Sequence, residues 1–141
     1  MIADFQKKMI PLMSGKAEGT FDSIAQPFLK LMCREVDRQK KRLGGDLSVA
    51  YLVESRKSRD LCREACPDIV FITLTLTPEC REKRLRLRHG EQYEVFKDIM
   101  KIFDGFEPAG DDEERAHNIT VTEDMTKEDV LNKALEIISK I

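Results

Sequence analysis

The sequence predicts an α/β fold in which helices flank a small parallel β-sheet. Three apolar, β-rich segments, at 47–54, 68–76 and 117–123, alternate with stretches of helical periodicity. Such alternation is typical of parallel strands that are joined by right-handed helical crossovers. A chain of 141 residues can bury one modest core, so we expect residues 1–141 to form a single domain.

The N-terminal part of the chain predicts helices around a loop. Apolar residues recur at helical spacing in 1–13, and the glycines and polar residues of 14–20 predict a loop. A long helix is expected from Asp22 or Ser23, either of which could cap it, to the pair Gly44 and Gly45. Its apolar stripe, expected to face the core, comprises Ile24, Phe28, Leu31, Met32, Val36 and Leu43.

The middle of the chain predicts two strands and two helices. The first strand, 47–54, is almost continuously apolar, as in a strand buried on both faces. Residues 55–66 predict a loop and a short helix that Pro67 closes, and 68–76 predict the second strand. Thr77 and Pro78 favour a helix start, as N-cap and first helical residue, and this helix is expected to end at His89 and Gly90.

The C-terminal part predicts a helix over 92–103, an acidic loop over 107–114, a strand over 117–123 and a last helix over 125–141. Thr126 is the expected N-cap of that last helix. Its inward positions are expected to be Val130, Leu131, Ala134, Leu135, Ile137 and Ile138.

Composition favours a protein that works in the cytoplasm. The net charge of -2 gives no argument for a nucleic-acid or membrane partner, and no apolar run has the length of a membrane span. The opening segment MIADFQKKMIPLM is interrupted by lysines and does not resemble a signal peptide. No two of the four cysteines have C-x-x-C spacing, so we expect reduced thiols and no metal site.

Two groups of arginines are candidates for binding anions. Arg56, Arg59 and Arg63 follow the first expected strand, at the sheet edge where open α/β sheets bind ligands. Arg84 and Arg88 lie one turn apart on the helix after the second strand, and such guanidinium groups suit phosphates and carboxylates. Each group could instead be a solvated basic surface that neighbouring Asp and Glu residues neutralise.

Four segments in the same order resemble the gluconokinase family of small-molecule kinases. SRDLCREACPDIVFITL (58–74) is similar to the segment after the third strand of that family, and EKRLRLRHG (82–90) is similar to its lid. FDGFEP (103–108) resembles its F-E-x-L-E-P motif, and MSGKAEGTFDSIAQPFL (13–29) resembles its loop and helix ending in P-W-L. The resemblance runs from about residue 13 to the end of the chain.

The resemblance implies the P-loop kinase fold of shikimate and adenylate kinases, with the lid at about 79–92. It implies that the complete kinase transfers the γ-phosphate of ATP, with Mg²⁺ as cofactor, to a small hydroxyl or phosphate acceptor. Arg84 and Arg88 would then be catalytic and would contact the nucleotide phosphates, with Gly110 and Thr122 toward the adenine. The residues implied on the acceptor side are Ser55, Arg56, Arg59 and Arg63.

The family also has a G-x-x-G-x-G-K-[ST] loop, which holds phosphates on backbone amides and a lysine, and this sequence contains no match to it. We therefore expect the fold to be incomplete at its N-terminus and this chain alone to be inactive. Three interpretations stay open: part of an active kinase whose P-loop lies upstream, a kinase-like domain that binds a nucleotide or protein without catalysis, and an unrelated interaction domain. The acceptor is undetermined, and a homodimer is possible because an incomplete sheet exposes an edge.

Overall fold

The computed structural model describes Lys7, Ile10 and the ranges 21–103 and 105–141, and these residues form two compact units. Unit 1 contains the described residues up to Ile69 together with Lys101–Glu107, apart from residue 104. Unit 2 contains Val70–Met100 and Pro108–Ile141. The helix expected within 1–13 and the loop expected at 14–20 lie outside the described residues, apart from Lys7 and Ile10, which are helical.

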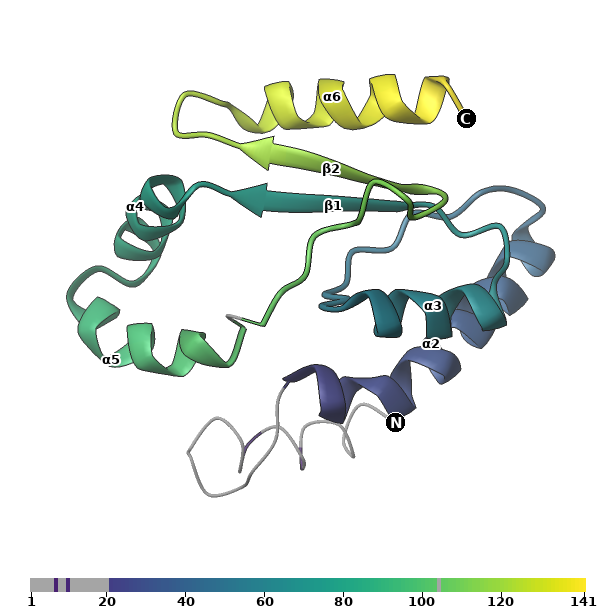
Figure 1. The fold of residues 1–141 in the computed structure, drawn as a ribbon, viewed down its shortest axis with the longest axis horizontal. Helices are drawn as coiled ribbons and strands as arrows, with labels where there is room; N and C mark the ends of the chain where they lie inside the picture. Colours follow the sequence, from purple (N-terminus) through teal and green to yellow (C-terminus); the bar gives the residue numbers. More distant parts are fainter. Residues whose placement is uncertain (1–6, 8–9, 11–20, 104) are drawn as a thin grey trace. The chain divides into compact units, whose positions relative to one another are not determined.

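Unit 1 is built on two packed helices, α2 (Phe21–Leu43) and α3 (Arg56–Ala65) (Figure 1). Both helices were predicted. The fully buried line on α2 is Ala25, Leu29 and Cys33, and Cys62 is the buried counterpart on α3. The thiols of Cys33 and Cys62 share a hydrogen bond, which lowers the pKa of Cys33 and raises that of Cys62.

The residues that α2 buries differ from the apolar stripe that the sequence predicted. Leu31 and Leu43 are exposed, whereas Ile24, Phe28, Met32 and Val36 lie half-buried beside the buried line. The small residues Ala25 and Cys33 reach the interior because a close helix–helix contact favours short side chains. The helix ends as predicted, since Gly44 has a φ of 71° and its N–H donates to the Lys40 carbonyl.

The predicted strand over 47–54 is absent. This segment is extended but has no strand partner among the described residues, and Leu47, Val49 and Tyr51 are exposed. To another described segment, its backbone makes one hydrogen bond, which the Glu107 N–H donates to the Glu54 carbonyl at 2.7 Å. An apolar β-rich sequence becomes a strand only where a neighbouring segment completes its ladder of hydrogen bonds.

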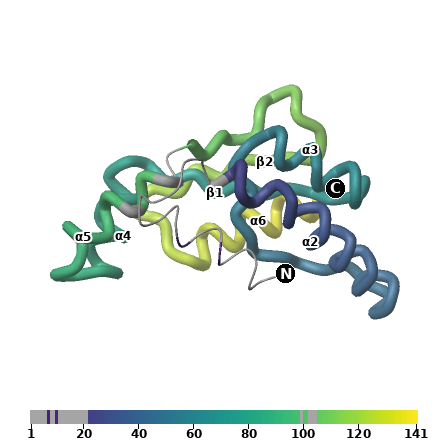
Figure 2. The backbone as a smooth tube through the Cα atoms, turned by 90° about the horizontal axis from the view of Figure 1, so that it is seen from below, coloured from purple at the N-terminus to yellow at the C-terminus, as the bar shows by residue number. Residues whose placement is uncertain are grey.

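Unit 2 is centred on two parallel strands, β1 (Phe71–Leu76) and β2 (Ala116–Val121), with Phe71 paired to Ala116 and Leu76 to Val121. Helix α6 (Lys127–Ser139) runs along the strands in both views (Figures 1 and 2). The α/β class and the parallel pairing are as predicted, although the sheet has two strands among the described residues and not three. Its core consists of Cys80, Ile119 and Val121, covered by Ile72, Met125, Val130, Ala134 and Ile137.

Of the helices between the strands, the first has the bounds that the sequence predicted, and the second is shorter than expected. Helix α4 (Pro78–His89) has Thr77 as its N-cap, and Gly90, at φ 53°, ends it. The single helix expected over 92–103 is instead divided into three pieces. These are the 3-10 turn η1 (Gly90–Gln92), the helix α5 (Tyr93–Ile99) and the 3-10 turn η2 (Met100–Phe103).

The last helix buries only half of its expected apolar face. Val130, Ala134 and Ile137 contact the core, whereas Leu131, Leu135 and Ile138 are exposed. Two strands are too narrow to cover a wider stripe on the helix, so the outer positions face away from the sheet. Thr126 caps α6 through a capping box with Asp129, as its sequence position predicted.

Among the described residues, no helix combines the length and the apolar composition needed to cross a membrane.

Candidate functional site

The predicted site residues divide between the two units. Ser55, Arg56, Arg59 and Arg63 belong to unit 1, and Arg84, Arg88, Gly110 and Thr122 belong to unit 2. Each group is therefore described within its own unit.

Helix α4 begins at the carboxyl end of β1. Because β1 and β2 are parallel, Thr122 directly follows β2 at the same edge of the sheet. The Thr77 N–H donates to the Val121 carbonyl at 3.2 Å, and the Lys83 ammonium lies 3.6 Å from the Glu123 carboxylate. These contacts hold the start of α4 against the loop that contains Thr122.

Two basic side chains of α4 have partners that neutralise them. Arg86 forms an ion pair with Glu82 at 2.7 Å, and its guanidinium lies 4.2 Å from the centre of the Tyr93 ring. The hydrogen bonds that Arg86 donates to the Glu82 carboxylate raise the pKa of Arg86. Glu82 is one of the acidic neighbours that the sequence indicated for this helix, whereas Lys83 faces Glu123, which lies outside the helix.

Arg84 and Arg88 differ from these two. Both side chains are exposed, and neither forms a hydrogen bond or an ion pair with any described residue. They lie four residues apart on one α-helix, and so face the same side. Two exposed guanidinium groups at this spacing can bind one multiply charged anion without breaking any existing ion pair.

A shallow hollow of about 390 Å³ lies beside a different part of α4. Its lining consists of Glu79, Glu82, Lys83, Arg86 and Leu87, and neither Arg84 nor Arg88 contributes to it. Two carboxylates and an ion-paired arginine make this hollow unsuited to an anion.

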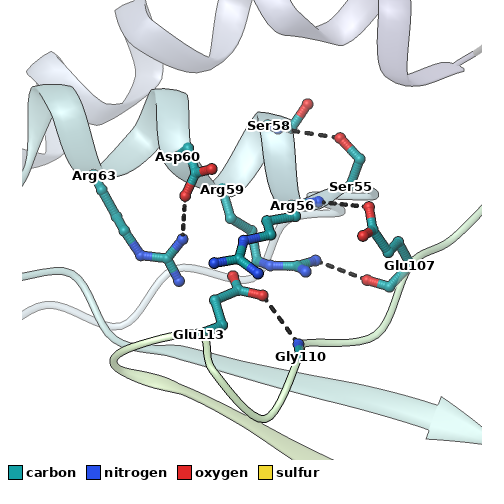
Figure 3. Close-up of polar contacts among 9 residues, drawn as sticks. All are labelled: Ser55, Arg56, Ser58, Arg59, Asp60, Arg63, Glu107, Gly110 and Glu113. Carbon is teal, nitrogen blue, oxygen red and sulfur yellow. Dashed lines mark hydrogen bonds and ion pairs between the residues drawn. The ribbon is translucent and has the colours of Figure 1, made fainter.

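Gly110 occupies a turn that is fixed to the middle of β2. Its N–H donates to the Glu113 carboxylate at 3.2 Å (Figure 3). The Glu113 N–H donates to the Gly110 carbonyl at 3.0 Å. The preceding Ala109 exchanges two hydrogen bonds with the Asn118 side chain. This turn is anchored four residues before Thr122 along the strand. Among the described residues no hydrogen bond joins Gly110 to Thr122, although both were expected toward the adenine.

The arginines of unit 1 are largely engaged with the protein itself. Arg59 is fully buried and donates to the Glu107 carbonyl at 2.8 Å, and Arg63 pairs with Asp60 at 2.8 Å (Figure 3). The backbone N–H of Arg56 donates to the Glu107 carboxylate, and the Arg56 side chain is half-buried. In this structure Arg59 therefore holds the 105–107 segment in place, whatever else it binds.

A polar cluster around Asp22 was not predicted from the sequence. Ser55 and Ser58 donate to the two oxygens of the Asp22 carboxylate, at 2.8 and 2.6 Å, and Gln26 adds a third donor at 3.0 Å. Ser55 is also the N-cap of α3, accepting from the Ser58 N–H. Asp22 lies in the first turn of α2, so the prediction that it could cap this helix is wrong. A serine just before a helix was the one available signal for Ser55.

Glu54 is the second residue that the sequence did not indicate. It is 2% exposed, and burial followed by the charge of Asp22 raises its pKa. The backbone N–H of Asp22 acts in the opposite direction and lowers the pKa of Glu54. Its geometry falls short of a hydrogen bond to the Glu54 carboxylate. In the sequence Glu54 is only the last residue of the expected strand 47–54.

Among the described residues, no group of three or more His, Cys, Asp and Glu side chains is arranged to hold a metal ion. The four cysteines are free and buried. No protein-family model matches the chain, and the search of curated proteins found no significant match.

Proposed function

We propose that this chain is part of a P-loop-type small-molecule kinase similar to the gluconokinases, in which α4 binds the phosphates of ATP. The observation that supports this proposal best is the exposure of Arg84 and Arg88 and their lack of ion pairs with the described residues. These two residues are exposed and lack partners among the described residues, while Lys83 and Arg86 of the same helix are paired.

Like charges one helical turn apart repel each other and destabilise a helix slightly. A triphosphate relieves that repulsion, because each guanidinium can donate charge-assisted hydrogen bonds to phosphate oxygens. Phosphoryl transfer uses such groups to stabilise the charge on the transferred phosphate. In this proposal Arg84 and Arg88 have both roles.

The position of α4 in unit 2 also supports the proposal. Ligands of open α/β sheets bind beyond the carboxyl ends of the strands, and α4 and Thr122 both follow such ends. A nucleotide bound at this edge would have Thr122 within its surroundings. ATP supplies the phosphoryl group and Mg²⁺ would accompany it, but the described residues suggest no ligand set for that ion.

On the acceptor side we propose Ser55, Arg56, Arg59 and Arg63. Arg56 and Arg63 are half-buried, and Arg59 is fully buried. An anionic acceptor, such as a sugar acid or a nucleoside monophosphate, would complement this group.

A second candidate is a kinase-like domain that binds a nucleotide or a protein partner without catalysis. This candidate needs no G-x-x-G-x-G-K-[ST] motif to hold the β- and γ-phosphates, and the given sequence contains none.

Binding and turnover separate the two candidates. ATP affinity should be measured on this chain, and phosphoryl transfer to sugar acids and nucleoside monophosphates should be measured on the longest natural polypeptide that contains it. Affinity with turnover supports the kinase, and affinity without turnover supports the binding module. A chain without affinity for ATP or for tripolyphosphate would contradict both the kinase and a nucleotide-binding module.

A further inference from the structure

Glu54 is a buried carboxyl group that the proposed function does not use. Its side chain is 2% exposed, and neither Oε1 nor Oε2 has a hydrogen-bond partner among the described residues. Ionisation in such a place is costly, because neither water nor a protein donor stabilises the charge. The folded chain therefore favours the neutral acid at this position.

Residues 105–107, here called the strap, lie against this carboxyl group. A Cβ atom placed on Gly105 would lie 3.2 Å from Glu54 Oε1 and 3.9 Å from its carboxyl carbon, so the backbone of Gly105 is next to the acid. The Glu107 N–H also donates to the backbone carbonyl of Glu54, at 2.7 Å. On this side of Glu54 the strap takes the place that water would need in order to hydrate a carboxylate.

The strap is held by hydrogen bonds at one residue, Glu107. Besides the bond to Glu54, the Arg59 guanidinium donates to the Glu107 carbonyl at 2.8 Å, and the Arg56 N–H donates to the Glu107 carboxylate at 2.9 Å (Figure 3). The strap itself belongs to no helix or strand. A segment of this kind can move away without unfolding the helices beside it.

Charged groups from each element around Glu54 fail to stabilise a carboxylate there. Asp22, in the first turn of α2, adds a negative charge that disfavours a second one on Glu54. On α3, the buried Arg59 gives its hydrogen bond to the strap and none to Glu54, and Arg56 contributes its backbone N–H to Glu107. The strap brings a further carboxylate, that of Glu107, so an ionised Glu54 can be stabilised only by water.

We propose that the strap is a pH-sensitive closure, which stays closed while Glu54 is a neutral acid and opens when Glu54 ionises. Opening admits water to the carboxylate and breaks the hydrogen bonds at Glu107, including the one that Arg59 donates. One proton on Glu54 thus controls the contact between the strap and α3. The strap lies in unit 1, and its opening is independent of the phosphate-binding role of Arg84 and Arg88.

The Glu107 amide reports on the strap, because its N–H is bonded to the Glu54 carbonyl in the closed form. Its hydrogen exchange should be measured by NMR on the full chain from about pH 4 to about pH 8, as a protection factor, which removes the pH dependence of the exchange chemistry. We expect protection to fall by up to about tenfold for each pH unit above about 4.3, the ordinary pKa of glutamate, until Glu54 is ionised in the closed form.

The variant Glu54→Gln cannot ionise, so its Glu107 protection should not change with pH. Asp46→Asn is the control, since it neutralises a side chain that is 98% exposed and should keep the pH dependence of the wild type. The amide of Cys62, in the buried part of α3, should be better protected than that of Glu107 at every pH, because the strap opens while α3 stays folded.

A wild-type Glu107 protection that is constant with pH, or one that falls equally in Glu54→Gln, would overturn the proposal. Equal protection of the Glu107 and Cys62 amides would overturn it as well, since the strap would then open only when α3 unfolds.

Discussion

Glu54 experiences two effects that disfavour its charge, burial and the neighbouring carboxylate of Asp22. Both raise its pKa in the folded state above the usual value of about 4.3 in an unfolded chain. The folded state therefore holds a proton more tightly than the unfolded state does. This stabilisation is complete below the unfolded pKa and is lost as the pH rises through the folded pKa.

We accordingly predict that Glu54→Gln stabilises the protein at neutral pH. Glutamine cannot ionise, so the variant does not lose stability where the wild type does. Thermal unfolding between pH 4 and pH 8 should show a difference in Tm, variant minus wild type, that grows with pH. A difference that is constant over this range would mean that Glu54 does not titrate as described.

Arg59 should matter for stability. Its buried guanidinium holds the Glu107 carbonyl at 2.8 Å, so Arg59→Ala removes a charged donor and leaves a cavity. We predict a loss of about 2–4 kcal/mol in the free energy of unfolding, measured by urea denaturation.

The matched control for Arg59 is Arg34→Ala on α2, where the side chain is exposed and the change should stay within about 0.5 kcal/mol. If the two variants are equally stable, the buried hydrogen bond of Arg59 contributes nothing measurable.

At the scale of single elements, caps were the most reliable signals in the sequence. Thr77 with Pro78, Gly44 and Thr126 each mark a helix end where the structure has one, because their effect is local. The strand expected over 47–54 failed, since strand formation depends on a distant partner that local sequence cannot specify. For the same reason, the buried faces of α2 and α6 were only partly predicted.

The capping box of α6 gives a prediction at this scale. Thr126 accepts from the Asp129 N–H at 3.1 Å, and the Asp129 carboxylate accepts from the Thr126 N–H at 2.8 Å. Thr126→Ala removes one half of this box and should cost about 1 kcal/mol in unfolding free energy.

Lys133→Ala, an exposed change in the middle of α6, is the control for the cap and should have little effect. A Thr126→Ala variant that unfolds at the same urea concentration as Lys133→Ala would show that the cap does not stabilise the helix.

At the scale of the whole molecule, the α/β class and the parallel strand pair followed from the alternation of segments along the chain. The exposed arginines of α4 were also identifiable from sequence, because their spacing alone puts them on one face. The cluster of Asp22, Glu54, Ser55 and Ser58 was not, because it joins residues up to 36 positions apart. Such clusters can be recognised only once the three-dimensional structure is known, because polar residues so far apart in the sequence share no periodicity.

The central claim is that Arg84 and Arg88 bind a polyphosphate, and calorimetric titration of ATP into three proteins tests it most directly. These proteins are the wild type, Arg84→Ala with Arg88→Ala, and Lys83→Ala with Arg86→Ala. Both double variants remove two positive charges from α4, but the second removes only residues that are already paired. We predict that the first double variant weakens ATP binding by roughly tenfold to a hundredfold, while the second changes it by less than about threefold. Equal affinities in the two double variants would contradict the claim.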